Sequence, residues 1–553
     1  MAVADVVFTG GSVFSAGDES SSPADVAIAG GRIIAIGSPE AVAETIGPDT
    51  RMIDTARRLI VSGFQDAHVH PIIAGLELLR CDLSTATSAD ECLQMISTYA
   101  HTHPDEPWIT GGGWSMGYFE GGTPTAAALD AVVSDRPVII VNRDHHGAWV
   151  NSRALEIAGI TAETPDPADG RIERLADGSP SGTLHEGAMA LVQQHQPAVD
   201  ADLAYQSLLR AQDELLRFGI TSWQDAMVGD AFGVSDILAV YLRAQSEGTL
   251  KVRVTAALWW ERDRGLEQVE EMAARRAEIS ALGTPERLRA DTVKIMVDGV
   301  AENFTAAMST PYLDGHGHPT GNSGHSFLDP AVLSDTVVAL DAAEFQVHFH
   351  ALGDRAVTEA LDALEAAAAA NAPHERRHHL AHLQVVGEAD VARFAELGVT
   401  ANLQALWAAH EDQLDELTIP FLDPALVERH YPFGDLERAG VRLAAGSDWP
   451  VTSPDPVAAI HVAVGRVAHG STAEPLGPEQ SLSLASALTA YTAGSAYVNG
   501  REDSTGRLAV GLLADLVVLD RDPFALPSEA IAETQVVSTW IDGIPVYQRA
   551  STD

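Results

Sequence analysis

Eight short apolar runs, separated by stretches rich in Ala, Leu and Glu, constrain the fold of this 553-residue chain more than any other feature. The runs cover residues 59–61, 219–223, 252–256, 292–297, 345–349, 379–383, 399–402 and 441–445. Such runs suit strands that are buried on both faces, and the stretches between them suit helices. Alternation of this kind is typical of a parallel α/β barrel or a doubly wound sheet.

The two ends of the chain have a different pattern. Apolar pairs broken by Gly-Gly predict short strands and hairpins within residues 5–36, and residues 511–519 and 536–541 also have strand character. We expect the strands of both ends to pair in one composite sheet. Residues 76–199, between the first two predicted barrel strands, are too many for one loop, so an inserted subdomain is predicted there.

Composition and charge narrow the possible partners. No apolar run reaches the length of a membrane span, residues 1–10 do not resemble a signal peptide, and two cysteines are too few for a disulfide framework. We therefore expect a cytoplasmic protein. The net charge of −44, from 34 basic and 78 acidic residues, disfavours nucleic acid and membranes as partners. A small-molecule substrate is expected instead, and a homodimer is one state that the sequence leaves open.

Histidines follow the first predicted barrel strand in the order His68-Val69-His70. In an extended strand, residues two apart face the same way, so His68 and His70 can both point at one metal ion. A single His-x-His pair is more often two unrelated polar residues at the end of a strand. The pair therefore indicates a metal site only together with other residues of the same kind.

Three further residues of this kind stand at the ends of later predicted strands. His350 and His382 end consecutive strands, and Asp448 follows the last one. Neutral imidazole is a common ligand of Zn²⁺. A carboxylate can bind metal and also accept a proton from metal-activated water. Each residue alone is ordinary, but the ordered set at successive strand ends predicts a site for divalent metal.

Lys294 lies inside the apolar run 292–297, and the chain has only one other lysine, Lys251. Burial favours the neutral amine of a lysine. A neutral amine can take up CO2 and become a carbamate, which is an anion able to bridge two metal ions. The alternative is an ammonium group paired with Asp298 or Glu302.

The ordered set of His-x-His, Lys, His, His and Asp resembles the amidohydrolase superfamily. Further motifs resemble the amidohydrolase family 3 group of YtcJ-like and N-substituted formamide deformylase-like proteins. They are GFQDAHVH over 63–70, GGW over 112–114, NSRAL over 151–155, GTLHE over 182–186, VKI over 293–295, DG over 298–299, HALGDR over 350–355 and GSDWP over 446–450. The resemblance runs through nearly the whole chain.

The resemblance implies an α/β fold with three parts. These are a distorted (β/α)8 barrel of the TIM type from residues 63–76 and 200–499, a composite β-sandwich from 1–62 and 500–553, and an inserted α/β subdomain from 77–199 that covers the barrel mouth. It also implies one or two Zn²⁺ ions, or another divalent transition metal, bound by His68, His70, Lys294, His350, His382 and Asp448.

The inserted subdomain adds candidates of its own. Family members carry a glutamate at the position of Glu186, so either Glu186 or Lys294 can supply the bridging anion. We prefer Lys294, because it lies on the predicted fourth strand, where related enzymes place a carbamate. His146 is a candidate for polarising a substrate carbonyl or a structural histidine. Substrate-binding candidates are Trp114, Tyr118, Trp149 and Arg355, although the aromatic residues could instead form the core of the insert.

The predicted function is hydrolysis of a non-peptide C–N bond in an amide, N-substituted formamide, carbamate or cyclic amide. Metal-activated hydroxide would attack, and Asp448 would act as the general base. The alternatives are an ester hydrolase or a deaminase on the same metal site, and a scaffold without activity. A scaffold is expected to lose ligands, and here the whole set is present.

Overall fold

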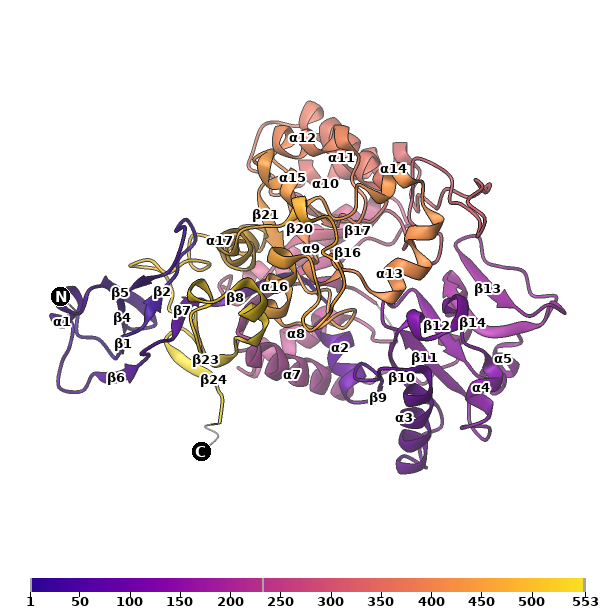
Figure 1. The fold of residues 1–553 in the computed structure, drawn as a ribbon, viewed down its shortest axis with the longest axis horizontal. Coiled ribbons are helices and arrows are strands. Elements are labelled where there is room, and N and C mark those ends of the chain that lie inside the picture. Colours follow the sequence, from indigo (N-terminus) through magenta and orange to yellow (C-terminus); the bar gives the residue numbers. More distant parts are fainter. Residues whose placement is uncertain (1, 231–232, 551–553) are drawn as a thin grey trace.

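The computed structural model describes residues 2–230 and 233–550, and its centre is a sheet of eight parallel strands (Figure 1). The sheet has the order β21-β20-β19-β18-β17-β16-β15-β8, and it is nearly closed, because the Asp448 N–H donates to the His68 carbonyl (2.7 Å) across the seam. The strands are β8 (Phe64–Val69), β15 (Ile220–Val228), β16 (Arg253–Trp259), β17 (Leu288–Met296), β18 (Gln346–Ala351), β19 (His379–His382), β20 (Thr400–Leu403) and β21 (Leu443–Ala445). The predicted barrel is confirmed.

Helices surround this sheet because its strands are buried on both faces. Every residue of β8 and of β18 is buried: one face of each strand points into the barrel, and the other needs a cover of helices. The main helices that follow the strands are α7 (Ala201–Arg217), α8 (Ile237–Ser246), α9 (Glu267–Ala281), α10 (Pro330–Ala342), α11 (Asp354–Ala370), α12 (Glu388–Leu397), α15 (Phe433–Arg438) and α16 (Pro456–Gly465). The helix α7 begins after Asp200, whose side chain accepts from the Leu203 N–H (2.7 Å), and so returns the chain from the insert to β15.

One predicted barrel strand is wrong. The run 59–61 forms β7 (Leu59–Ser62), which belongs to a different sheet, and the first barrel strand is the next segment, β8. Both segments are short and fully buried, but β8 contains Gln65, Asp66 and His68, whereas β7 begins with three apolar residues. The search for apolar runs therefore selected β7 and passed over the barrel strand beside it.

Two sheets lie together at one end of the molecule; the first is N-terminal, and the second combines strands from both termini (Figure 1). One has the order β5-β4-β1-β6, from β1 (Val6–Thr9), β4 (Asp25–Ala29), β5 (Arg32–Gly37) and β6 (Arg51–Asp54). The other has the order β24-β23-β22-β7-β2-β3, from β2 (Ser12–Val13), β3 (Ser22–Pro23), β7, β22 (Leu516–Leu519), β23 (Val536–Ile541) and β24 (Ile544–Gln548). The Phe8 and Trp540 rings meet at 5.1 Å between the sheets. Of the C-terminal strands, β22 pairs with β7, and β23 and β24 extend the sheet from β22, so none of them pairs with a strand of residues 5–36.

The C-terminal strands are expected to be required for folding. Deleting the chain after Asp503 removes β22 to β24, exposes the edge of β7, and leaves Arg253, which is 1% exposed, without Asp515 (2.6 Å). We expect no soluble protein that unfolds cooperatively. The full-length variant Asp515→Ala, which keeps every strand, should lose on the order of 3 kcal/mol of stability. A soluble truncated chain with a cooperative thermal transition would contradict this account.

The segment between β8 and α7 carries a sheet of its own, as predicted for an insert. Its order is β13-β14-β12-β11-β10-β9, and it lies at the end of the molecule opposite the terminal sheets (Figure 1). The strands are β9 (Cys81–Asp82), β10 (Ile109–Trp114), β11 (Val138–Asn142), β12 (Gly147–Val150), β13 (Gly170–Arg174) and β14 (Pro180–Glu186), and the helices are α3 (Ala89–Thr102), α4 (Ala126–Asp130), α5 (Ser152–Ala158) and α6 (Ala190–Gln193). No described helix is long and apolar enough to cross a membrane.

Candidate metal and substrate site

The residues predicted to bind metal meet around one cavity of about 470 Å³. His68 lies on β8, His70 directly precedes α2 (Pro71–Leu78), His350 lies on β18, His382 ends β19, and Asp448 follows β21. The strands of a parallel barrel end on the same side, so distant parts of the sequence bring these side chains together. The position of Gly446 requires glycine, because a Cβ there would lie 2.6 Å from the His68 nitrogen.

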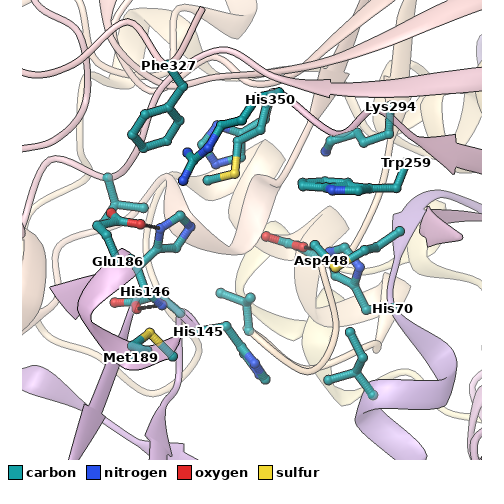
Figure 2. A pocket seen from close by; sticks show the side chains of 18 of the residues that line it. His70, His145, His146, Glu186, Met189, Trp259, Lys294, Phe327, His350 and Asp448 are labelled. Carbon is teal, nitrogen blue, oxygen red and sulfur yellow. Dashed lines mark hydrogen bonds and ion pairs between the residues drawn. The ribbon is translucent and has the colours of Figure 1, made fainter. Parts of the chain in front are cut away.

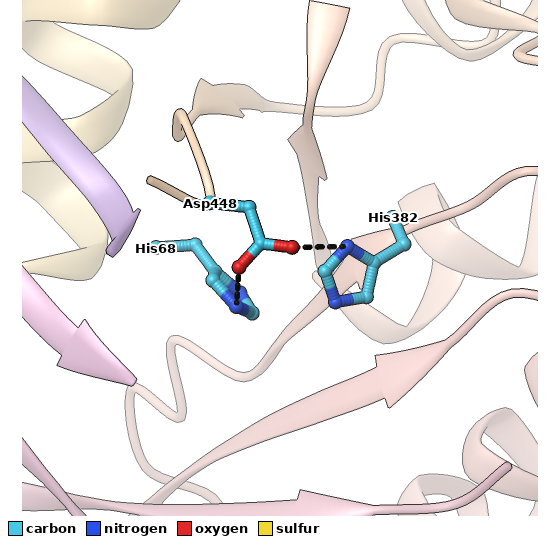
Figure 3. A group of neighbouring side chains, drawn as sticks. All are labelled: His68, His382 and Asp448. Carbon is cyan, nitrogen blue, oxygen red and sulfur yellow. Dashed lines mark ion pairs between the residues drawn. The ribbon is translucent and has the colours of Figure 1, made fainter. Parts of the chain in front are cut away.

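Asp448 is the centre of the group. Its Oδ1 lies 3.1 Å from His68 Nε2 and 3.0 Å from His70 Nε2, and its Oδ2 lies 3.9 Å from His382 Nδ1. Figure 3 shows His68 and His382 on either side of this carboxylate. The ligand atoms of His68, His382 and Asp448 all lie within 4.8 Å of one another, and no other group of this kind was found among the described residues.

The protonation states of this group suit a cation. Burial lowers the pKa of His68 to about 3 and holds the pKa of His382 well below its ordinary value, so both rings are neutral at pH 7. Although burial raises it, the neighbouring imidazoles hold the pKa of Asp448 well below its usual range. The group therefore presents imidazole nitrogens and an ionised carboxylate, which are ligands of Zn²⁺.

Unused nitrogen atoms support the same assignment. Both ring nitrogens of His382 are buried without a hydrogen-bond partner among the described residues. Buried polar atoms are nearly always paired, so these atoms need a ligand that the protein itself does not supply. A divalent ion fits this donor set, and the residues that would hold it are His68, His70, His382 and Asp448.

Two further contacts orient the histidines. His350 Nδ1 lies 3.3 Å from Asp298 Oδ1, and His348 Nε2 lies 2.9 Å from His68 Nδ1. A partner on one ring nitrogen fixes the direction of the other, as is common behind metal-binding histidines. The rings of His350 and His382 are neighbours, with centroids 4.5 Å apart.

Lys294 also lines the cavity, on β17 and beside Trp259 (Figure 2). Its side chain is buried, and burial lowers the pKa of its amine to about 7. Asp298 and Glu302, the predicted partners of a charged Lys294, contact other residues instead. Asp298 contacts His350, and Glu302 accepts a hydrogen bond from Thr418 Oγ1 (3.1 Å). Burial without an acidic partner therefore favours the neutral amine.

Glu186 and His146 form a pair on the side of the cavity that faces Asp448 and Lys294 (Figure 2). Glu186 Oε2 lies 2.9 Å from His146 Nδ1, and Oε1 accepts from Thr305 Oγ1 (2.7 Å). Although burial lowers it, Glu186 raises the pKa of His146 to about 9. Both oxygens of Glu186 are occupied, and Glu186 lies outside the group of His68, His382 and Asp448. The contact with Glu186 thus favours the protonated imidazole of His146, which lines the cavity.

Comparison with known families decides what kind of protein this is. The family model described as the amidohydrolase family matches residues 51–547. The chain belongs to the amidohydrolase family. This amidohydrolase is 30% identical over 549 residues to the protein YtcJ of Bacillus subtilis, covering 98% of this chain and 99% of that protein. It is 28% identical over 549 residues to N-substituted formamide deformylase of Arthrobacter pascens, covering 95% of both.

Two further relatives extend the comparison. The amidohydrolase is 30% identical over 555 residues to the protein LONG AFTER FAR-RED 3 of Arabidopsis thaliana, covering 99% of this chain and 92% of that protein. Its fold is similar to the crystal structure of an uncharacterized metal-dependent hydrolase from Pyrococcus horikoshii, with a TM-score of 0.71 and 24% identity over 95% of this chain and 99% of that one. The similarity to the crystal structure concerns the fold.

Four predicted substrate-binding residues of this amidohydrolase do not line the cavity. Trp114 and Trp149 are fully buried in the core of the insert, and their indole groups donate to backbone carbonyls. Tyr118 packs against the same core and donates to the Ala86 carbonyl (2.9 Å). Arg355 holds the loop that precedes α10 through Ser326 Oγ (2.9 Å) and backbone carbonyls. The insert needs a core of its own, and these aromatic residues form it.

Other residues that line the cavity were missed by sequence reasoning. They are mainly aromatic and sulfur-containing side chains, together with one histidine next to His146: His145, Met189, Met227, Trp259, Trp260, Met296, Phe327 and Trp407. Trp259 ends β16 and Trp260 follows it, so their position at a strand end was a usable signal. Phe327 and Met189 lie on connecting segments, and their approach to the cavity depends on tertiary packing.

Proposed function

We propose that this amidohydrolase is a metal-dependent enzyme that hydrolyses a non-peptide C–N bond in an amide, N-substituted formamide, carbamate or cyclic amide. The observation that carries the proposal is the buried group of His68, His382 and Asp448, which opens on a cavity with an aromatic wall. One or two Zn²⁺ ions are the proposed cofactor. The relative from Arthrobacter pascens, by its name an N-substituted formamide deformylase, supports this bond class.

A divalent ion in such a site polarises a carbonyl group and lowers the pKa of water. Asp448 is ionised and so can accept a proton from the attacking water at its carboxylate oxygen. Delivery of that proton to the leaving nitrogen completes the exchange of the C–N bond for a C–O bond. The protonated His146, across the cavity, can donate a hydrogen bond to the substrate carbonyl, and Glu186 holds it in the charged form.

Lys294 is proposed to supply an additional anionic ligand as a carbamate. Its neutral amine would form an N–C bond to CO2 and release one proton, which replaces a costly buried cation by an anion beside the metal ligands. Glu186 is the competing candidate for this role. Because Thr305 and His146 occupy both of its oxygens, we favour Lys294.

A panel of substrates tests the bond class. Zinc-loaded protein should release amine from some N-formyl or N-acetyl amines, and it should act on these more rapidly than on matched esters of the corresponding alcohols. The aromatic cavity wall favours substrates with an apolar substituent on nitrogen. Faster hydrolysis of the esters, or release of ammonia from ring amines alone, would replace this proposal with an ester hydrolase or a deaminase.

A further inference from the structure

A second cavity, of about 260 Å³, adjoins the cavity of the metal-binding candidates. Ile73, His145 and Gln193 line both cavities, so the two are neighbours. The second cavity lies between α2, the insert strands β10 and β11, and the segment that follows α6. It is therefore placed to receive a part of a substrate that extends beyond the metal-binding candidates.

One face of α2 connects the two cavities. Ile73 lines both of them. Leu76, Glu77 and Arg80 line the second alone, and they follow three, four and seven residues further on, a spacing that places them on one side of a helix. A helix rises 1.5 Å per residue, so Arg80, just beyond the end of α2, lies roughly 10 Å past Ile73. Because α2 begins directly after His70, this face leads from the metal-binding candidates to Arg80.

Arg80 carries a charge that the protein itself does not use. Its side chain is partly exposed and forms no hydrogen bond or ion pair with the described residues. Its guanidinium nitrogens are absent from the buried atoms that lack a partner, so they are open to solvent and to a ligand. A guanidinium stays charged and binds a carboxylate through two parallel hydrogen bonds. Arg80 is therefore a candidate carboxylate site.

The other ionisable groups of the second cavity leave this charge uncompensated. Burial raises the pKa of Glu77 to about 8, which favours its neutral carboxyl. Glu77 Oε1 lies 3.2 Å from Nε2 of His145, and burial lowers the pKa of that imidazole to about 3. Gly112 makes room for the Glu77 carboxyl, because a Cβ there would overlap it. The cavity wall beside Arg80 is thus built from neutral groups.

The exposed charged residues that line the first cavity are unsuited to a carboxylate. All of them are acidic, namely Asp230, Glu261 and Asp263, and they would repel an anion. Arg262, which also lines the first cavity, is already bound to Asp169. An anionic group remote from the scissile bond is therefore directed towards Arg80.

We propose that the second cavity is the distal part of the substrate site, where Arg80 binds a carboxylate on a flexible chain remote from the scissile bond. The substrate class is then an acylated amine that carries a terminal carboxylate. This inference rests on the proposed function for the identity of the scissile bond, whereas the carboxylate site itself can be tested by binding alone.

The test uses N-acyl benzylamines whose acyl chain ends in a carboxylate, namely the succinyl, adipoyl, suberoyl and sebacoyl compounds. A second series, of N-acetyl ω-amino acids, places the chain on the amine side. Each compound is paired with its terminal carboxamide, which has nearly the same shape and no charge. Dissociation constants are measured by calorimetry on the full-length protein, and kcat/KM is measured where turnover occurs. At the best chain length, wild-type protein should prefer the carboxylate by roughly tenfold or more.

Substitutions of Arg80 test whether this preference depends on its charge. Arg80→Gln should bring the ratio close to one, mainly by weakening the carboxylate probe, and Arg80→Lys should keep part of the preference. Arg80→Met gives the same test as Arg80→Gln if that variant does not fold. Arg58→Gln is the matched control, because Arg58 is also partly exposed and without a side-chain partner among the described residues, but lines neither cavity. Its ratio should equal that of wild-type protein.

Three results would overturn the proposal. They are a ratio near one in wild-type protein at every chain length of both series, an unchanged ratio in folded Arg80→Gln or Arg80→Met, and binding of no probe. A preference for the carboxylate that disappears in Arg80→Gln, without turnover of any probe, would support the carboxylate site and count against the proposed function.

Discussion

Replacing Asp448 by asparagine is expected to lower kcat by roughly 10²- to 10⁴-fold while most of the metal stays bound. Asparagine keeps the shape of the side chain and one carbonyl oxygen, but it cannot take up a proton. The backbone also tolerates the change, because Asp448 has φ +55° and asparagine is one of the few residues that adopt this conformation readily. The measurements are kcat and the metal content of the purified variant.

A matched control variant distinguishes loss of the general base from an effect of the substitution on the backbone. Asp236 has φ +51° and begins α8, where it pairs with Arg275 at 3.0 Å on the surface. Asp236→Asn is therefore the same substitution at a similar positive φ, and it should keep the wild-type rate. A near wild-type kcat in Asp448→Asn would show that Asp448 is not the general base, and loss of all metal would assign it a purely ligating role.

Lys294→Ala is expected to remove nearly all activity and to lower the metal content. If Lys294 carries a carbamate, then acetate or formate added to the variant should restore part of the rate by replacing the missing anion. Metal-free wild-type protein should also need bicarbonate for full activity when metal is added back. Lys251→Ala is the control, because Lys251 is the only other lysine and lies exposed, 3.9 Å from Asp213.

The competing assignment predicts different results. If Glu186 supplies the bridging anion, Glu186→Gln should lose metal, and reconstitution should not depend on bicarbonate. Under the account given above, Glu186→Gln instead keeps its metal and removes the charge that holds His146 protonated. Activity would then fall without loss of metal. Metal content of the two variants therefore separates Lys294 from Glu186.

The metal-binding candidates could be predicted because barrel topology brings strand ends together. His68 lies roughly three hundred residues before His350 and His382, yet each of the three stands at or near the carboxyl end of a barrel strand, and parallel strands end on one side. The run 59–61 was assigned to the barrel because three apolar residues alone do not indicate which sheet the strand joins. The strand formed by this run, β7, pairs with the C-terminal strand β22, which lies more than four hundred residues away in the sequence.

The substrate-binding residues were harder to predict because aromatic side chains serve cores and cavities equally well. Trp114 and Trp149 lie in the insert, close to several of the family motifs, but they form part of the hydrophobic core of the insert. Trp260 and Trp407 lie outside the quoted motifs and line the cavity. Only the tertiary structure distinguishes the two pairs, through the presence or absence of an acceptor for each indole N–H.

Metal dependence is the central claim, and elemental analysis combined with chelation tests it most directly. Purified protein is expected to contain about one or two transition-metal ions per chain. Removing them should abolish hydrolysis of whichever N-acyl amine is the best substrate, and adding Zn²⁺ should restore it. His382→Ala should prevent that restoration, because both ring nitrogens of His382 are left for a ligand. Full activity of metal-free protein would contradict the account.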